Sequence, residues 1–241
     1  MKTDELIIKI ANKVGKIHFM KVIFRNIYDW FLERKLKKSI SNFQKNGLEA
    51  LEVFNQVFTE NGYKYSLAFG TLLGSIREKD FIPHDDDLDL AMWINDYSPE
   101  IIDKLEEKGV KLVCSFTVNG DQIGKEQTFC YKGVLIDIFY FYRDNDGIVY
   151  CCDFVNQPNC SDRYESIKKH GGLLPRKIML PLGEELITID FKGLKVSIPK
   201  NYSEILSFRY GVDFMTPKPG WKPQTNYIKP MYEFLGIYKE Y

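Results

Sequence analysis

Four aspartates fall within five consecutive positions of the sequence, in the stretch FIPHDDDLDLAMW (residues 81–93). The apolar run at residues 88–94 predicts a β-strand, in which residues two apart point to the same face. Asp87 and Asp89 should therefore project together, with Asp85 and Asp86 in the preceding loop. Like charges held that close oppose each other's ionisation unless a cation lies between them. The spacing predicts a site for a hard divalent cation, Mg²⁺ or Mn²⁺, which binds carboxylate oxygens and substrate phosphates.

A third carboxylate, Asp137, lies inside the apolar strand VLIDIFYFY (134–142), where a charge without a partner is costly. The glycine-containing turn FGTLLGSIR (69–77) precedes the aspartates and opens a short helix whose free N–H groups can hold phosphate. Arg77 would neutralise phosphate, and its alternative role is a surface ion pair with Glu78 or Asp80. A solvated aspartate-rich turn is the simpler alternative for the run. The apolar strand, the buried aspartate and the glycine turn together favour a metal and phosphate site.

The elements that must position these residues predict an α+β fold. Residues 4–40 have the helical apolar period and form one long helix or two shorter ones, followed by a helix at 42–61. Further helices are expected at 71–78, 98–108 and 201–211, strands at 63–69, 88–94, 111–118, 126–132, 134–142 and 147–154, and a hairpin at 186–199. A mostly antiparallel or mixed sheet with flanking helices follows. A strand, a glycine turn and helix, a D-x-D strand and a later strand with one Asp are the arrangement of nucleotidyltransferase-like folds.

Charge is unevenly distributed along the chain. Residues 1–46 contain eleven Lys and Arg against four Asp and Glu, and because the whole chain is neutral the remainder carries minus seven. We expect a basic amphipathic helical segment at 1–44 and a catalytic domain at 45–241. Residues 1–40 would lie on an anionic membrane surface, or alternatively pack their apolar face on the domain with the lysines solvated. Nothing in this pattern indicates a nucleic-acid partner.

The expected location is cytoplasmic, with peripheral contact at the cytoplasmic membrane face. The chain has no run of about 18 uncharged apolar residues, so no membrane-spanning helix is expected. Its five cysteines include no C-x-x-C pair, so neither a disulfide framework nor a zinc site is predicted, and buried reduced thiols are expected.

The stretch GTLLGSIREKDFIPHDDDLDLAM (70–92) closely resembles the signature of the LicD family, GTLLGxxRxxxFIPWDDDIDI. This family includes bacterial phosphocholine transferases and, more distantly, fukutin and fukutin-related protein. The later strand LIDIFYFY resembles the family's second aspartate strand, and residues 176–217 resemble its closing pattern of a Tyr-Gly helix end and a proline. The similarity extends over about residues 45–217.

The resemblance implies a metal-dependent phosphotransferase. Its donor would be CDP-activated, CDP-choline or a CDP-polyol, and phosphocholine or a polyol phosphate would pass to a hydroxyl of a cell-surface glycan or its lipid-linked precursor, releasing CMP. The alternatives are a nucleotidyltransferase that moves the nucleotide itself, and an inactive member that binds glycan or nucleotide.

Residue roles follow from the match to the motif. Metal ligands and catalytic carboxylates would be Asp87, Asp89 and Asp137, with Asp137 favoured to accept the acceptor's proton because its strand neighbours are apolar. Arg77 would be the catalytic, phosphate-binding arginine. The donor side would be bound by Gly70, Thr71, Gly74, Arg77, His84, Asp85 and Asp86. His84 stands where the family has Trp, and it either packs in its place or donates a hydrogen bond to phosphate.

Overall fold

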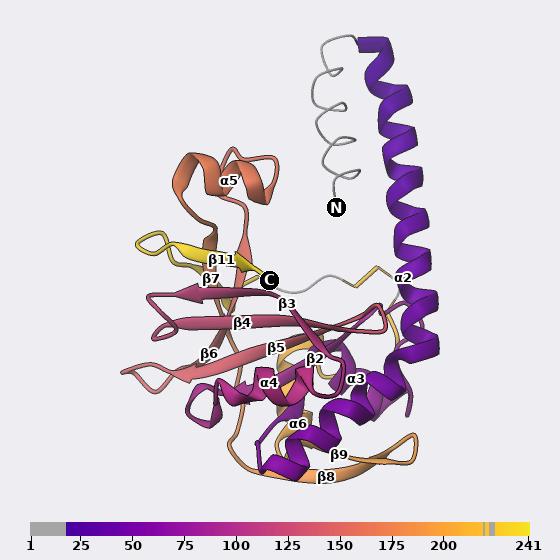
Figure 1. Ribbon diagram of the computed structural model, residues 1–241, viewed down its shortest axis with the longest axis vertical. Coiled ribbons are helices and arrows are strands. Elements are labelled where there is room, and N and C mark those ends of the chain that lie inside the picture. The colour runs from indigo at the N-terminus through magenta and orange to yellow at the C-terminus, as the bar shows by residue number, and fades with distance from the viewer. Residues whose placement is uncertain (1–17, 219, 222–224) are drawn as a thin grey trace.

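The computed structural model of the protein describes residues 18–218, 220–221 and 225–241. In this part of the chain the helices are α2 (His18–Asn61), α3 (Phe69–Arg77), η1 (Ile94–Asp96), α4 (Glu100–Glu106), α5 (Arg163–His170) and α6 (Tyr202–Tyr210). The strands are β1 (Ser66–Leu67), β2 (Asp87–Trp93), β3 (Lys111–Val118), β4 (Gly124–Tyr131), β5 (Val134–Arg143), β6 (Val149–Val155), β7 (Leu174–Met179), β8 (Leu186–Phe191), β9 (Leu194–Pro199), β10 (Ile228–Pro230) and β11 (Gly236–Glu240). Figure 1 shows α2 along one side of a curled sheet, with α3 and α6 near its lower end.

Helix α2 is continuous where the sequence predicted two helices. No glycine or proline occurs between residues 18 and 46, so nothing in the backbone chemistry ends a helix near residue 41. The helix ends as predicted at Asn61, where Gly62 has a φ of 72°. Since α2 runs through residue 44, the expected division between a basic segment and a catalytic domain lies inside one helix, and it stays a prediction.

The two halves of α2 have different surroundings. The second half buries a stripe of apolar side chains on the sheet, namely Phe43, Ala50, Leu51, Phe54, Val57 and Phe58. Phe54 contacts Phe58 and, on β4, Phe129 at ring-centroid distances of 5.6 and 5.8 Å. The first half extends beyond the sheet (Figure 1), and Trp30 and Leu36 there are at least half exposed. Most of the predicted apolar face of residues 4–40 lies outside the described residues.

The main sheet of the described chain has nine strands and confirms the predicted α+β class. Seven of its strands are hydrogen-bonded in the order β10-β7-β6-β5-β4-β3-β11. Strand β2 also pairs with β5, and β1 pairs with β2. The β2–β5 pair is parallel, whereas the other neighbours in this sheet are antiparallel. Strand β5 pairs with β2 and β4 along its first part and with β6 only at Tyr142 and Arg143, so the sheet curls there.

The two faces of β5 have opposite characters. Val134, Ile136, Ile138 and Tyr140 are fully buried in the core formed with α2, while the alternate residues face the other side. Asp137 is therefore on the face opposite its two isoleucine neighbours, as the alternation predicted.

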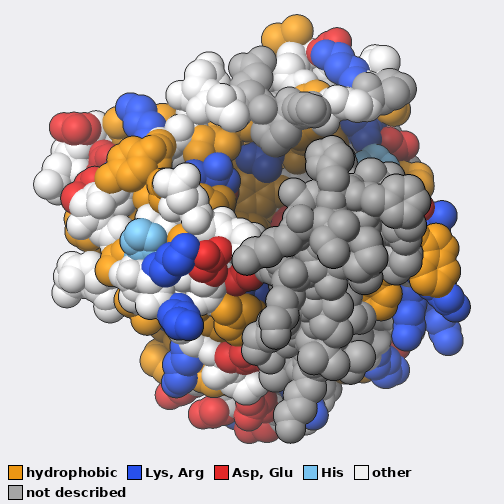
Figure 2. Space-filling model, turned by 90° about the horizontal axis from the view of Figure 1, so that it is seen from above, with side chains coloured by type: hydrophobic (Ala, Val, Ile, Leu, Met, Phe, Trp, Pro, Cys, Tyr) orange, Lys and Arg blue, Asp and Glu red, His pale blue; other side chains and the backbone are white. Residues whose placement is uncertain are grey.

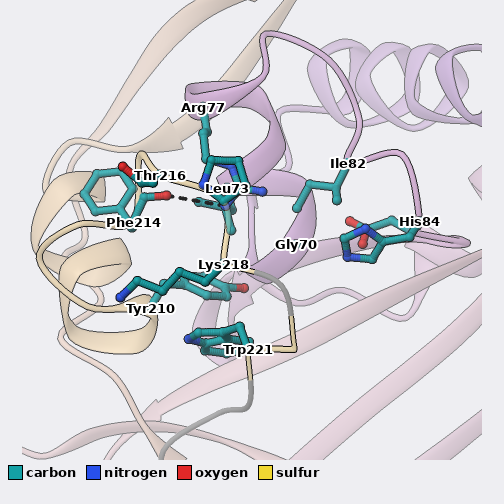
Figure 3. Close-up of a pocket in the computed structure, with 12 residues that line it drawn as sticks. Gly70, Leu73, Arg77, Ile82, His84, Tyr210, Phe214, Thr216, Lys218 and Trp221 are labelled. Atoms are coloured by element: carbon teal, nitrogen blue, oxygen red, sulfur yellow. Dashed lines mark hydrogen bonds between the residues drawn. The ribbon is translucent and has the colours of Figure 1, made fainter.

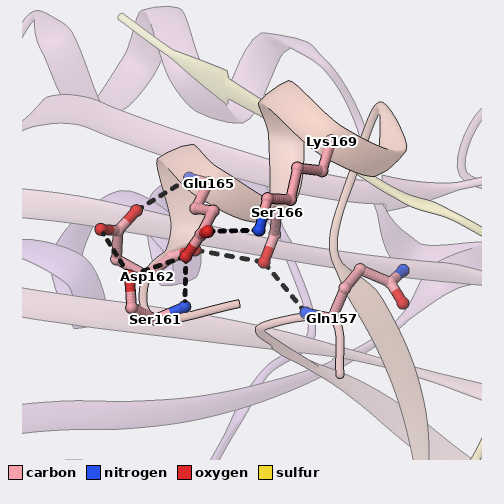
Figure 4. Close-up of polar contacts among 6 residues, drawn as sticks. All are labelled: Gln157, Ser161, Asp162, Glu165, Ser166 and Lys169. Carbon is pink, nitrogen blue, oxygen red and sulfur yellow. Dashed lines mark hydrogen bonds and ion pairs between the residues drawn. The ribbon is translucent and has the colours of Figure 1, made fainter. Parts of the chain in front are cut away.

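Several elements were not predicted from the sequence. For the regions of helix α5 and strands β7, β10 and β11, the local sequence pattern predicted neither a helix nor a strand. The signals for α5 are present: Asp162 caps the helix by accepting the N–H of Glu165 at 2.8 Å, Ser161 donates its N–H back to Glu165 at 2.6 Å, and Gly171 ends the helix with a φ of 81° (Figure 4). The β8–β9 hairpin was predicted, and Lys192 and Gly193 both have positive φ at its turn.

The expectation of buried thiols holds for three of the five cysteines, while Cys130 and Cys160 are only partly buried. All five are free thiols, and Cys114, Cys151 and Cys152 are buried. None of the helices in the described residues has both the length and the apolar character needed to cross a bilayer.

Candidate functional site

Three carboxylates meet on one face of the parallel β2–β5 pair. Asp89 lies directly opposite Asp137 in the strand register, and Asp87 lies opposite Leu135. One oxygen atom from each of Asp87, Asp89 and Asp137 can be chosen so that all three lie within 4.8 Å of one another. The structure therefore brings together the three predicted metal ligands, from segments about 50 residues apart in the chain.

The site has an excess of buried negative charge. Burial, followed by repulsion from Asp137, Asp86 and Asp85, raises the pKa of Asp87 to about 7. Burial and the neighbouring carboxylates also raise the pKa of Asp89 well above its usual value. Burial raises the pKa of Asp137 despite a hydrogen bond to its side chain from Thr128. Its Oδ1 is buried and accepts no hydrogen bond from any described residue. An all-oxygen set with an unsatisfied buried acceptor fits a hard divalent cation.

Helix α3 fixes the orientation of Asp89. The Gly70 N–H donates to Asp89 Oδ2 at 3.1 Å, and the Asp89 N–H donates to the buried Thr71 hydroxyl at 2.9 Å. A further backbone bond joins the Ala68 N–H to the Asp89 carbonyl at 3.0 Å. Phe69 between them has a φ of 40°, which is unusual for a bulky residue. Gly70 and Thr71 were predicted to bind the donor, and in the structure both form hydrogen bonds with Asp89.

The two glycines of the predicted phosphate turn allow different close approaches. A Cβ at Gly70 would lie 2.7 Å from Asp85 Oδ2 and 3.5 Å from Asp89 Oδ2, so the missing side chain makes room for both carboxylates. A Cβ at Gly74 would lie 2.7 Å from the Asp80 carbonyl oxygen. Gly74 therefore lets α3 pack on the backbone that leads into the aspartate run.

A cavity of about 380 Å³ adjoins the triad at Gly70 and Asp85 (Figure 3). It lies between α3, the loop before β2, and the segment that follows α6. Its lining residues are Gly70, Leu73, Arg77, Ile82, His84, Asp85, Tyr210, Phe214, Thr216, Pro217, Lys218 and Trp221. Thr71, Gly74 and Asp86 were predicted on the donor side but are not among these residues.

Arg77 forms the ion pair with Glu78 that the sequence offered as its alternative role, and its phosphate-binding role stays a prediction. Its Nε donates to Glu78 Oε1 at 2.7 Å, which is one of the two ion pairs foreseen. The other candidate, Asp80, pairs instead with Lys192. The Arg77 side chain is only 12% exposed, lies in the cavity wall, and donates from Nη1 to the Phe214 carbonyl at 3.4 Å.

The C-terminal side of the cavity contains residues that sequence reasoning missed. The rings of Tyr210 and Trp221 lie 4.7 Å apart between centroids. The Arg209 guanidinium lies 4.3 Å from the centroid of the Phe69 ring and is hydrogen-bonded to Tyr210. Its charge partly offsets the burial and carboxylate repulsion that raise the pKa of Asp89. The quoted closing pattern included Tyr210, Gly211 and Pro217, but no local signal placed this segment beside the aspartates.

Comparison with known proteins shows a family match whose range includes the three carboxylates. Residues 62–201 match the family model described as "LicD/FKTN/FKRP, nucleotidyltransferase domain". The chain is 28% identical over 207 residues to "Ribitol-5-phosphate transferase FKTN" of Mus musculus, covering 83% of this chain and 41% of that protein. The Homo sapiens protein of the same name is 25% identical over 225 residues, with 90% and 45% covered. "Lipopolysaccharide cholinephosphotransferase LicD" of Haemophilus influenzae is 44% identical over 50 residues, 21% of this chain and 19% of that protein. The chain thus spans less than half the length of these relatives.

The charge excess predicts a pH-dependent stabilisation by Asp87→Asn in the absence of divalent cations. An aspartate in the unfolded chain ionises near pH 4, whereas the raised pKa of Asp87, about 7, keeps its proton bound in the folded state. Asp87 therefore makes a contribution to the stability of the wild-type protein that becomes less favourable as pH rises from about 4 to about 7, and the variant lacks this contribution. The variant's advantage in melting temperature should be small near pH 4, grow toward pH 7 and then level off. Thermal unfolding with chelator across this range measures it.

The exposed Asp146→Asn serves as the control for this experiment, because it removes one carboxylate far from the triad. A difference between Asp87→Asn and wild type that is the same at every pH would show that burial and repulsion do not act on Asp87 as described.

Proposed function

Since the chain belongs to the LicD/FKTN/FKRP nucleotidyltransferase-domain family, we propose that it is a metal-dependent phosphotransferase with a CDP-linked donor. The relatives named above are, by their names, transferases of phosphate-containing groups. The group moved would be phosphocholine or a polyol phosphate, the acceptor a hydroxyl of a cell-surface glycan or its lipid-linked precursor, and the product CMP. One observation supports this most: three convergent carboxylates adjoin a cavity lined by aromatic and basic side chains.

The cavity suits a nucleotide diphosphate. Tyr210 and Trp221 offer aromatic faces for the cytosine ring, since every base has a face that stacks. Arg77 and Lys218 add positive charge to the same cavity for phosphate oxygens. With the base against Trp221, the diphosphate would extend past Gly70 toward the carboxylates, because that is where the cavity meets the triad.

The divalent cation would be Mg²⁺ or Mn²⁺, held by Asp87, Asp89 and Asp137. When bound, it would supply charge stabilisation for the phosphoryl oxygens and for departing CMP. In this arrangement Gly70 and Thr71 orient Asp89. The primary role of Asp137 would be to bind the cation, and accepting a proton would be its second role. The parallel strand pair that carries D-x-D and the third aspartate supports the nucleotidyltransferase-like description of the sheet.

We also propose that the N-terminal part of the chain contacts the cytoplasmic face of a membrane. The exposed side chains of α2 include Trp30, Leu32 and Leu36, which are 57%, 43% and 50% exposed. Basic residues Arg34, Lys37 and Lys38 alternate with them along the same stretch. Apolar and basic groups together are typical of peripheral binding to anionic lipid. Such contact would bring the enzyme to a lipid-linked acceptor.

Asp87→Asn and Asp89→Asn should reduce donor turnover by at least about 100-fold, because each removes a direct ligand of the cation. The assay incubates purified protein with Mg²⁺ and a panel of CDP-choline, CDP-ribitol and CDP-glycerol, and measures CMP release. Asp146→Asn is the matched control. Near-wild-type turnover in either variant would contradict the metal-site proposal. The mass of the acceptor product separates phosphotransfer from nucleotidyl transfer, since the acceptor gains either the substituted phosphate or the nucleotide.

Trp221→Ala should weaken binding of the CDP-linked donor by about 10- to 100-fold, the usual effect of losing one base-stacking partner. Calorimetric titration with donor and Mg²⁺ measures the change. Binding of inorganic pyrophosphate should be unchanged, because it has no base. Trp30→Ala, which removes an exposed indole on α2, is the control. Equal loss of pyrophosphate and donor binding would show that Trp221 does not hold the base.

Flotation with vesicles tests the membrane contact. The full chain should float with vesicles that contain anionic lipid at low salt and remain behind with neutral vesicles, because both charge and apolar side chains contribute. Replacing Trp30 and Leu36 together by Glu should reduce the floated fraction by more than half. Wild-type protein that stays in the soluble fraction at low salt would reject this proposal and leave the transferase proposal standing.

A further inference from the structure

The face of the sheet that carries the triad continues beyond β5. In the register of β4 with β5, Thr128 lies opposite Asp137 and Glu126 lies opposite Phe139. In the next pair, Phe116 on β3 lies opposite Glu126. Residues directly opposite each other on neighbouring strands point to the same side of a sheet. Glu126 therefore shares the face of Asp137, one strand farther from the donor cavity.

Glu126 is a partly buried carboxylate that no described residue binds. No hydrogen bond or ion pair reaches it from the described part of the chain. Burial, then the charges of Asp137, Asp153 and Asp89, raise the pKa of Glu126 well above its usual value. A nearby arginine does not relieve this, because Arg176 donates from Nε to Asp153 at 2.9 Å and forms a second bond to it from Nη2. A carboxyl group that no described residue hydrogen-bonds can accept a hydrogen bond from a ligand.

The in-line geometry of phosphoryl transfer indicates on which side of the triad an acceptor would bind. The cavity for the donor is formed by α3 and the segment after α6, which lie on the β2 side of the triad. In phosphoryl transfer the attacking and leaving oxygens are roughly in line through phosphorus. With CMP leaving toward the cavity, the attacking hydroxyl has to arrive from the opposite side. Strand β4, which carries Glu126, pairs with β5 and not with β2, so an acceptor bound there would be separated from the donor cavity by the triad.

We propose that Glu126 binds the acceptor, with its carboxylate accepting a hydrogen bond from a hydroxyl of the sugar or polyol. This inference rests on the proposed phosphotransferase function. A carboxyl group is suited to the task, because its carbonyl oxygen accepts a hydrogen bond from a hydroxyl whether or not the group is ionised.

The surroundings of Glu126 fit a sugar ring. Phe116 stacks on Phe154 with centroids 5.0 Å apart and 18° between the ring planes, and its ring is 5.3 Å from that of Tyr238 on β11. The Arg163 guanidinium lies 4.5 Å from the centroid of the Tyr238 ring. Aromatic surface with a few polar groups is the usual lining of small-ligand sites. Figure 2 shows the molecule from above, the end at which Figure 1 places α5 and β11, and hydrophobic and basic side chains are both present on this face.

Helix α5 makes this aromatic region rigid. Arg163 is its first residue, and the capping bonds of the helix hold the turn in place (Figure 4). The Ser166 hydroxyl donates to the Asp162 carbonyl at 3.1 Å and accepts the Gln157 N–H at 2.9 Å, which ties the helix to the end of β6. The acceptor region is thus built from ordered elements that all lie outside the donor cavity.

The test compares transfer to an alcohol with transfer to water. Full-length protein is given Mg²⁺ and a CDP-linked donor, with glycerol and methyl glycosides as acceptor probes. Mass spectrometry measures the ratio of acceptor product to hydrolysed phospho-substituent. Glu126→Ala should lower this ratio about 10- to 100-fold, and Glu126→Gln should lower it less because its amide still accepts a hydrogen bond. Donor affinity by calorimetry should stay within about twofold, and CMP release to water should persist.

Glu240→Gln, on the same face but exposed at the edge strand β11, is the matched control and should change nothing. The proposal is overturned if Glu126→Ala keeps the wild-type ratio, or if donor affinity falls as much as the ratio does. Should the alanine variant fail to fold, the isosteric glutamine variant decides by the same ratio. A wild-type protein that releases CMP from no donor would instead reject the phosphotransferase function, and the acceptor role with it.

Discussion

The repulsion among three carboxylates within 4.8 Å is the constraint on which this structure depends. Like charges directly opposite each other on paired strands destabilise a sheet, yet Asp89 and Asp137 are held in that position by the parallel register of β2 and β5. The opposing force comes from the other face of the same strands. Leu88, Leu90, Ile136 and Ile138 are completely buried there, and each contributes about 1.5–3 kcal/mol of burial free energy. The burial free energy of the core face thus stabilises the strand pair against the charge repulsion on the other face when no cation is bound.

The site joins two distant parts of the chain. Arg77 on α3 donates to the Phe214 carbonyl across 137 residues, and Arg209 on α6 lies over the ring of Phe69 at the start of α3. The C-terminal segment supplies one wall of the cavity, and Arg209 contributes to the electrostatic surroundings of Asp89. The match to the family model ends at residue 201, so the aromatic wall of the donor cavity lies just beyond it.

The sequence predicted those parts of the site that depend on local geometry. The period of two in a strand placed Asp87 and Asp89 on one face, and the cost of a lone buried charge singled out Asp137. The parallel pairing of β2 with β5 was not readable, because register between distant strands leaves no local pattern. Aromatic residues are so frequent in this chain that type alone did not distinguish Tyr210 or Trp221. Thr71 has the motif position of a donor-binding residue, but its buried hydroxyl accepts the Asp89 N–H instead.

The distribution of charge across the sheet gives the site a direction. On the β2 side, Arg77, Lys218 and Arg209 surround the cavity and its junction with the triad, which suits a polyphosphate. On the β4 side lies Glu126, whose carboxyl oxygens can accept a hydrogen bond from a neutral hydroxyl. Glu126 on β4 is the diagonal neighbour of Asp137 on β5, and such neighbours are about 7–8 Å apart, whereas Asp89 lies one strand farther away on β2. The carboxylates that would hold a cation therefore lie on β2 and β5, whereas the carboxyl group that would bind an acceptor lies on β4.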